Sequence, residues 1–450
     1  MRKMGKTIAL LGLTALFCLT ATGCSFRLAS AEELFSLPQL PAEYTELEKS
    51  IQSILQNDAE YAAPRSGTNT QPVQMVDLNG DGQEEALVFV NDGTGDKPLK
   101  IYIFTPNAHD YEQTAVIEGS GTAIYSINYN DLDQDGRMEL LVGWQLSNRL
   151  QALTVYTMHS GQPEELMQTP YVKYAVTDLN QDDRQELVVL RADAENNSIA
   201  DYYTFRSGAL DLTSTARIST TMAELSRIKS GQIQGGTPAL FVTGVENSAT
   251  EITDVLTDHS GELTNITLSD DTGVTTAITR FRSLYPTDIN GDGVTEVPSA
   301  YILPNTGDQE TEPCYRIDWL SYDAEGKPVT AESTYHDSED GWYLVLAPQW
   351  SGKILVTRTL SGTDEASVTF AYQEEAGKPP QDFLRIYTFT GNSREIKAVR
   401  GNRFILSRQT ETIYSGELLS ANAGWTGGLT EADLRARFSL ITTEWLAGDN

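Results

Sequence analysis

Residues 77–90 read DLNGDGQEEALVFV, an acidic, glycine-containing segment that turns directly into an apolar run. The arrangement recurs as DLDQDGRMEL from Asp131, DLNQDDRQEL from Asp178 and DINGDGVTEV from Asp288. Each copy carries oxygen-bearing side chains at positions 1, 3, 5 and 9 and an aliphatic residue at position 2. A segment repeated in this way predicts a repeated structural unit.

The spacing of the copies predicts one further unit. Their starts lie 54, 47 and 110 residues apart, so the last interval is about twice the others. Residues 231–240, GQIQGGTPAL, fit the gap: Gly236 stands where the loop glycine is expected, and an apolar run begins at Leu240. Because the metal-type side chains are absent, we interpret this segment as a unit that kept its shape and lost its ion.

Apolar runs rich in β-branched and aromatic residues surround each loop, bounded by Gly, Asn, Asp and Ser, as is typical of β-strands. In the first unit these runs are residues 73–76, 86–90, 100–104 and 113–117. Four strands in a unit of about 50 residues are typical of a propeller blade. We therefore predict an all-β fold, a β-propeller of five to seven four-stranded blades with six favoured. A solenoid is the competing repeat architecture.

Short helices are expected at both ends of this array. The first, within residues 42–60, places four aliphatic residues on one helical face and predicts a capping helix: Leu47, Ile51, Ile54 and Leu55. Near the other end, Thr430 and Asp433 approximate a capping box. We expect the repeated blades in residues 61–340, and one or more divergent blades with the terminal helix in residues 341–450.

The loop chemistry points to calcium, which takes six to eight hard oxygen ligands. Alternate side chains at positions 1, 3 and 5 can point inward, and a glutamate at position 9 can close the shell. Glycine at position 6 permits the left-handed backbone of the turn. Up to four Ca²⁺ ions are predicted, held by Asp77, Asn79, Asp81, Glu85, Asp131, Asp133, Asp135, Glu139, Asp178, Asn180, Asp182, Glu186, Asp288, Asn290, Asp292 and Glu296. The competing interpretation is an Asx-rich turn without an ion.

The four loops are not equivalent, and none is an EF-hand. The second loop has four carboxylates and is expected to bind most tightly, whereas Asp183 replaces the position-6 glycine of the third and is expected to strain it. An EF-hand requires glutamate at position 12 between flanking helices. Position 12 instead holds Val88, Val142, Val189 and Ser299, and strand-like sequence follows.

The four loops, D-x-[DN]-x-D-[GD]-x-x-E from Asp77, Asp131, Asp178 and Asp288, resemble those of the FG-GAP and VCBS repeats, the family that includes the calcium-binding blades of integrin-type propellers. The resemblance covers residues 70–340 most clearly. It implies a β-propeller with calcium in the loop between the first two strands of a blade. It does not imply one activity, since such propellers serve in adhesion, in ligand binding and as enzyme scaffolds.

The beginning of the chain predicts export. A basic segment, an apolar run and small residues precede Cys24, as in a secretory signal. The tetrad ATGC ending at Cys24 resembles the lipobox of bacterial lipoproteins, which implies a signal peptide in residues 1–23, lipidation of Cys24 and a flexible tether in residues 24–41. The expected location is the bacterial cell envelope, on the outer face of the cytoplasmic membrane or at the outer membrane of a Gram-negative cell, held by the lipid anchor alone.

The net charge of the chain restricts the classes of molecule that it can bind. The net charge of −31 disfavours nucleic acid and anionic lipid surfaces as partners and favours cations.

No catalytic residue is assigned. Three of the four histidines (His109, His159 and His259) are expected in turns, His336 at the surface, and the tryptophans in the core. We expect a monomeric surface lipoprotein that binds a protein or a glycan. The alternatives are a polysaccharide-active lyase or hydrolase and a structural partner of an export system.

Overall fold

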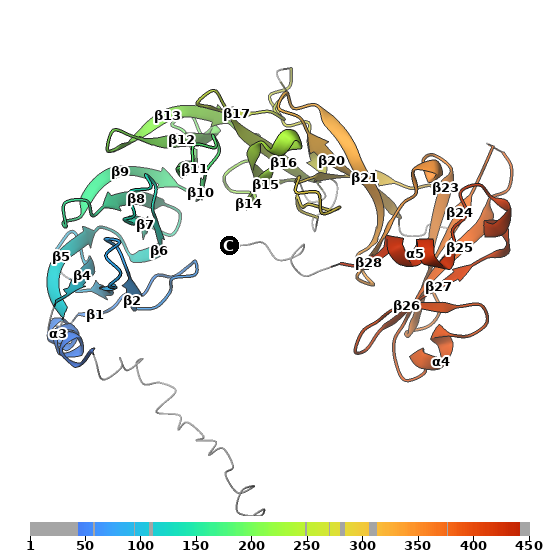
Figure 1. The fold of residues 1–450 in the computed structure, drawn as a ribbon, viewed down its shortest axis with the longest axis horizontal. Helices are drawn as coiled ribbons and strands as arrows, with labels where there is room; N and C mark the ends of the chain where they lie inside the picture. The colour runs from blue at the N-terminus through green and yellow to red at the C-terminus, as the bar shows by residue number, and fades with distance from the viewer. Residues whose placement is uncertain are drawn as a thin grey trace, which may run out of the picture. The chain divides into compact units, whose positions relative to one another are not determined.

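The computed structural model describes residues 44–56, 59–93, 95–107, 111–247, 250–269, 271–279, 284–305, 313–375 and 377–441 (Figure 1). The expected signal peptide, Cys24, the tether and His109 lie outside these residues. No helix in the described part of the chain is both long enough and apolar enough to cross a bilayer. The structure forms two compact units: one contains the N-terminal helix and Pro106–Glu112, and the other contains the remaining elements.

The first unit confirms the helix expected near the N-terminus. Helix α3 spans Thr45–Leu55, with Leu47 and Ile51 almost fully buried. Its apolar residues recur three and four positions apart, which places them on one face. Glu46 and Glu48 lie in the first turn, where carboxylates interact favourably with the helix dipole.

The second unit begins with three antiparallel sheets that confirm the predicted strands. The first has β1 (Glu60–Tyr61), β2 (Val73–Val76), β3 (Glu85–Asn91), β4 (Leu99–Pro106) and β5 (Tyr111–Gly119). The second has β6 (Ala123–Asn130), β7 (Glu139–Gln145), β8 (Gln151–Thr157) and β9 (Glu164–Tyr171). The third has β10 (Lys173–Thr177), β11 (Glu186–Ala192), β12 (Ser198–Arg206) and β13 (Ala209–Arg217).

The unit inferred from the doubled interval is also present. Its sheet has β14 (Leu225–Gln232), β15 (Pro238–Asn247), β16 (Thr250–His259), β17 (Glu262–Asn265) and β18 (Ile278–Thr279), with the turn η2 (Gln234–Gly236) in place of a loop. Gly236 has a φ of 76°, the left-handed conformation expected of the loop glycine. The backbone turn therefore survives although its acidic side chains are gone.

Two further five-stranded sheets complete the second unit. One has β19 (Val297–Ile302), β20 (Tyr315–Tyr322), β21 (Pro328–Asp337), β22 (Trp342–Val345) and, at its edge, β28 (Phe438–Leu440). The other has β23 (Ile354–Leu360), β24 (Glu365–Tyr372), β25 (Gln381–Phe389), β26 (Phe404–Arg408) and β27 (Ile413–Leu418). Between strands lie α4 (Arg394–Ala398), η3 (Pro348–Trp350), η4 (Ser420–Gly424) and α5 (Glu431–Arg437). Thr430 and Asp433 form the predicted capping box of α5.

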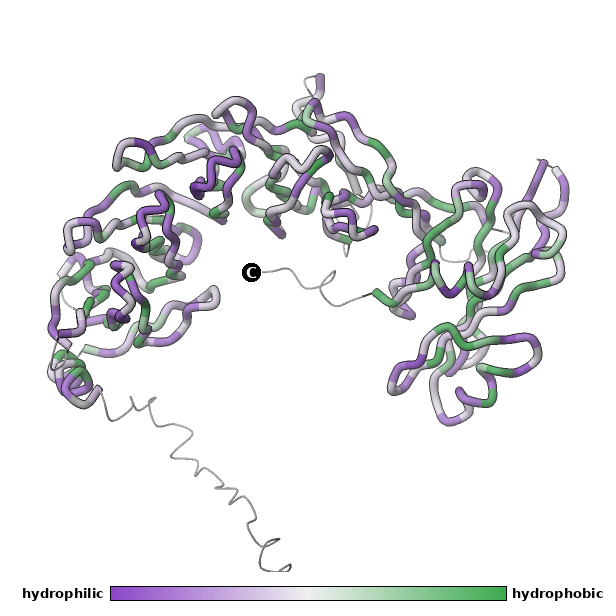
Figure 2. Tube along the Cα trace, in the orientation of Figure 1, coloured by the Kyte–Doolittle hydropathy of each residue, from purple (hydrophilic) through white to green (hydrophobic). Residues whose placement is uncertain are grey.

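Successive sheets of the second unit pack face to face. Leu140 and Val142 of β7 lie in a core cluster with residues of the first sheet, whereas Leu141 lies in a cluster with Leu187 and Val189 of the third sheet. Because side chains alternate along a strand, one strand contributes to the cores on both sides of its sheet. The same alternation continues through β11 and β15. Many of the turns that connect these strands are hydrophilic, as the purple segments of Figure 2 show.

The aromatic residues expected in the core are there, but one histidine prediction is wrong. Trp144, Trp319, Trp342 and Trp350 are at most 2% exposed. His336, expected at the surface, is only 7% exposed in β21. Its ring lies 5.8 Å from that of Trp319 and 5.2 Å from that of Tyr343, and burial lowers its pKa to about 3. The strand pairing of β21, which buries this position, is not visible in the local sequence.

Candidate metal centres

The loops of the first three sheets connect the first and second strands: β2 to β3, β6 to β7 and β10 to β11. In the fifth unit the first strand is reduced to a bridge between Thr287 and Glu296, and the loop leads into β19. The position-1 carboxylate organises the turn. Asp77 accepts from the amides of Gly80 at 2.8 Å and Gly82 at 2.9 Å. Asp178 and Asp288 accept from the equivalent amides of their loops.

Two positions in every loop adopt a left-handed backbone. At position 6 the φ values are 85° for Gly82 and Gly136, 88° for Gly293 and 70° for Asp183, which confirms the strain expected in the third loop. Position 4 is also left-handed, and there the second and third loops hold Gln134 and Gln181. A non-glycine residue in this region costs roughly 1 kcal/mol. This second left-handed position was not predicted, although the change from glycine to glutamine at position 4 is visible in the sequence.

The position-9 glutamates close the loops from inside. All four are at most 2% exposed, and one oxygen of each accepts from the position-2 amide of its own loop at 2.8 to 3.1 Å: Glu85, Glu139, Glu186 and Glu296. Burial raises the pKa of the last three to about 7. A buried carboxylate in this setting is costly to ionise unless a positive charge lies nearby.

The side chains present fit a divalent cation. Single oxygens of Asp131, Asp133 and Glu139 lie within 4.8 Å of one another, and so do those of a set in the third loop: Asp178, Asp182 and Glu186. Oxygens that each lie about 2.3–2.6 Å from one calcium ion must cluster at about this separation. In addition, Oδ1 of Asp131 and Oε1 of Glu296 are buried and have no hydrogen-bond partner among the described residues. Calcium would supply the missing positive charge at these oxygens.

Neighbouring loops contact each other through their backbones. The position-8 amide of one loop donates to the position-2 carbonyl of the preceding one: Met138 to Leu78 at 2.9 Å, Gln185 to Leu132 at 3.3 Å and Thr295 to Gln232 at 2.8 Å. The last bond ends on the ion-less turn, so that turn keeps its place in the series. We call this series the loop ladder. Pro238, at position 8 of the ion-less turn, has no amide hydrogen, and the third loop meets this turn through Gln181 Nε2, which donates to the Gly236 carbonyl at 3.3 Å. A change in one loop can thus reach the following sheet.

His159 lies beside the second loop. Its Nδ1 is 3.0 Å from Oδ2 of Asp135, and its carbonyl accepts from Arg137 Nη1 at 2.8 Å. The predicted turn position of His159 is confirmed, but its contact with the second loop was not predicted. The contact depends on the hairpin from β8 to β9, which lies about 20 residues further along the chain.

A second repeated feature, missed from sequence, is a column of buried polar residues on the third strands. Thr154, Asp201, Asp254 and Asp318 occupy the place opposite position 12 of their units and are at most 8% exposed. Asp201 accepts from Arg191 Nε at 2.5 Å and Thr215 Oγ1 at 2.7 Å. A regular spacing in the sequence could have predicted this column, because Thr154, Asp201 and Asp254 each lie 23 positions after the start of their unit.

The comparison with protein-family models agrees with the repeat. Residues 77–142 match the family model described as an FG-GAP-like repeat, a segment that runs from the first loop into β7. Nothing among the curated proteins matches the chain. The crystal structure of the Saccharomyces cerevisiae Sqt1 is similar at 10% identity and a TM-score of 0.22, over 64% of this chain and 90% of that chain. Over residues 77–142 the chain is therefore similar to an FG-GAP-like repeat, and the repeated loops and antiparallel sheets are consistent with this match.

Proposed function

We propose that this protein is a bacterial cell-surface lipoprotein whose propeller blades, stabilised by calcium, form a binding module for a protein or a glycan. The FG-GAP-like match supports a binding module of propeller type. The observation that carries the calcium part is the pair of carboxylate clusters in the second and third loops. The N-terminal signal and Cys24 support export and lipid anchoring.

Calcium would act here as a structural element. Asp131, Asp133 and Glu139 would hold the ion of the second loop, with Asp135 as a further ligand. The ion supplies positive charge and fixes the loop, and the protein contributes the binding surface. With Cys24 carrying lipid, Cys314 is the one thiol left after the signal peptide, so an internal disulfide is excluded and bound ions would take over the role of cross-links. Each ion adds about 2.7 kcal/mol when free calcium is 100 times its dissociation constant.

A glycan array, read with the purified protein in calcium and again in EGTA, tests the binding function. We expect retention on a defined set of glycans, with loss of retention in EGTA. Incubation with the retained polysaccharide separates binding from catalysis. Release of reducing ends or of unsaturated products would overturn the binding module in favour of a hydrolase or lyase.

Membrane fractionation tests the location. The wild-type protein should sediment with the envelope and partition into detergent, whereas Cys24→Ser should be released in soluble form. Recovery of both proteins in the same soluble fraction would contradict the lipid anchor.

A further inference from the structure

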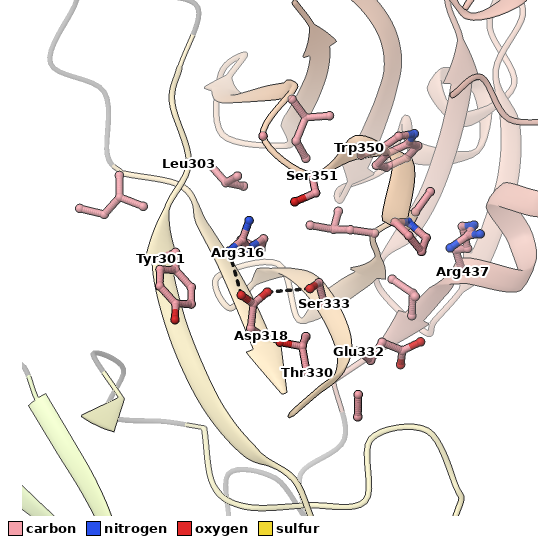
Figure 3. A pocket seen from close by; sticks show the side chains of 18 of the residues that line it. Tyr301, Leu303, Arg316, Asp318, Thr330, Glu332, Ser333, Trp350, Ser351 and Arg437 are labelled. Atoms are coloured by element: carbon pink, nitrogen blue, oxygen red, sulfur yellow. Dashed lines mark hydrogen bonds and ion pairs between the residues drawn. The ribbon is translucent and has the colours of Figure 1, made fainter. Parts of the chain in front are cut away.

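A pocket of about 530 Å³ lies in the C-terminal half of the second unit, away from the calcium loops (Figure 3). Its lining comes from β19, β20, β21, the segment from β22 to η3 and the last residue of α5. The size falls in the range of small-molecule sites, which are about 300–1,000 Å³. The elements that meet here are up to about 130 residues apart in the chain, so the pocket is a product of the tertiary fold.

One side of the pocket is apolar. Leu303, Leu346, Trp350 and Ile354 line it and belong to one core cluster. The Trp350 indole donates to the Gly427 carbonyl at 2.7 Å, which fixes the ring. Rigid apolar walls of this kind accommodate an apolar ligand body at little cost in ordering side chains.

Arg316 presents hydrogen-bond donors that the protein does not use. Its Nη2 donates to Oδ2 of Asp318 at 2.8 Å, and its guanidinium lies 4.9 Å from the ring centroid of Tyr301. Its Nε is buried with no acceptor among the described residues. Asp318 is engaged on both oxygens, since Ser333 donates to Oδ1 at 2.6 Å. The Arg316 side chain is 26% exposed, so the terminal nitrogen that does not pair with Asp318 can donate to an anionic ligand oxygen in the pocket.

The arginine is also an exception within the repeat. The residue two positions before the buried polar column is Ala152, Ile199 and Ile252 in the second, third and fourth sheets, and all three are buried. The fifth sheet has Arg316 in this place. The core of a blade thus needs no charge at this position. The presence of Arg316 there points to a role for this residue other than packing within the blade.

A second cation completes the lining. Figure 3 shows Arg437 with Glu332 on the side of the pocket opposite Arg316. In the described part of the chain, no carboxylate forms an ion pair with Arg437. The lining holds two arginines and two acids, Asp318 and Glu332, so its formal charge is balanced. In a protein with a net charge of −31, this local balance favours a ligand with one negative charge over one with several.

We propose that this pocket binds a small organic molecule that carries one carboxylate on an apolar body. Arg316 donates to the carboxylate through its free terminal nitrogen, and Arg437, on the opposite side of the pocket, adds a positive charge at longer range. The apolar body lies against Ile302, Leu303 and Leu346. The site is separate from the FG-GAP-like loops, and it stands whether or not the blades bind a protein or a glycan.

Isothermal titration of the purified full-length protein with octanoate, octanamide and octylammonium tests the proposal. The three probes share one chain length and differ in charge. We expect saturable binding of octanoate at one molecule per protein, with octanamide weaker by about tenfold or more, because a charge-assisted hydrogen bond is lost. Octylammonium should not bind. Equal affinity for octanoate and octanamide, or no saturable octanoate binding at millimolar concentration, would overturn the proposal.

Variants test the two arginines. Arg437→Gln should weaken octanoate binding several-fold, through the loss of a nearby positive charge, without changing that of octanamide. Arg435→Gln is the matched control on the same helix: Arg435 pairs with Glu431 and does not line the pocket. It should leave both affinities unchanged. Arg316→Gln should abolish the preference for octanoate over octanamide. Identical affinities in Arg437→Gln and Arg435→Gln would rule out the cationic site.

Discussion

Substitution of Gly80 by alanine should break the contact between the first and second loops. A Cβ at this position would lie 2.2 Å from the carbonyl oxygen of Gly136, a backbone atom that cannot move away alone. Gly80 also has a φ of 73°. The left-handed backbone costs alanine about 1 kcal/mol, and overpacking adds about 1–3 kcal/mol. The free energy of unfolding should therefore fall by about 2–4 kcal/mol.

Gly82→Ala is the matched control for Gly80→Ala. Gly82 has a φ of 85° but no atom within 4 Å of the added Cβ, so it carries only the backbone cost, about 1 kcal/mol. Urea unfolding of both variants in EDTA, followed by circular dichroism, measures the difference without any contribution from calcium. A loss of stability that is the same in both variants would refute the contact between the loops.

Two other predictions concern buried charges. Asp201→Asn should lower the free energy of unfolding by about 3 kcal/mol, since it breaks a pair whose carboxylate is fully buried, whereas Asp211→Asn at an exposed site should change it by less than about 0.5 kcal/mol in urea unfolding. The pKa of His336 in the folded protein lies below its ordinary value of about 6.5. As the pH drops below that value, the unfolded chain binds the proton and the folded protein does not, so the free energy of unfolding falls. Between pH 7 and pH 5 the free energy of unfolding of the wild type should fall by about 2 kcal/mol more than that of His336→Phe. Parallel pH profiles of the two proteins would contradict the burial of a neutral imidazole.

The local elements could be predicted from the sequence because their signals are local. The loops, the strands that flank them, the ion-less unit around Gly236 and the capping box of α5 all depend on residues close together in the chain. Such features can be predicted because the alternation of apolar residues and the turn-forming residues determine where a strand begins and ends. These boundaries do not depend on which other strand packs against it.

Features that depend on pairing between distant segments could not be predicted. Strand β28 adds to the edge of β22 from about 95 residues further along, and Arg437 reaches the pocket only because of that pairing. Asp201 and Asp254 look like surface acids in the sequence, yet each is buried by partners on neighbouring segments. For the same reason, the local sequence predicted an exposed His336.

Calcium titration of the purified protein tests the central claim most directly. We predict saturable uptake of up to four ions, with Asp131→Ala taking up one fewer. The thermal midpoint should fall in EGTA, since each lost ion removes about 2.7 kcal/mol when free calcium is 100 times its dissociation constant. The loops would be ion-free turns if the wild type took up no calcium, or if Asp131→Ala and EGTA left stoichiometry and midpoint unchanged.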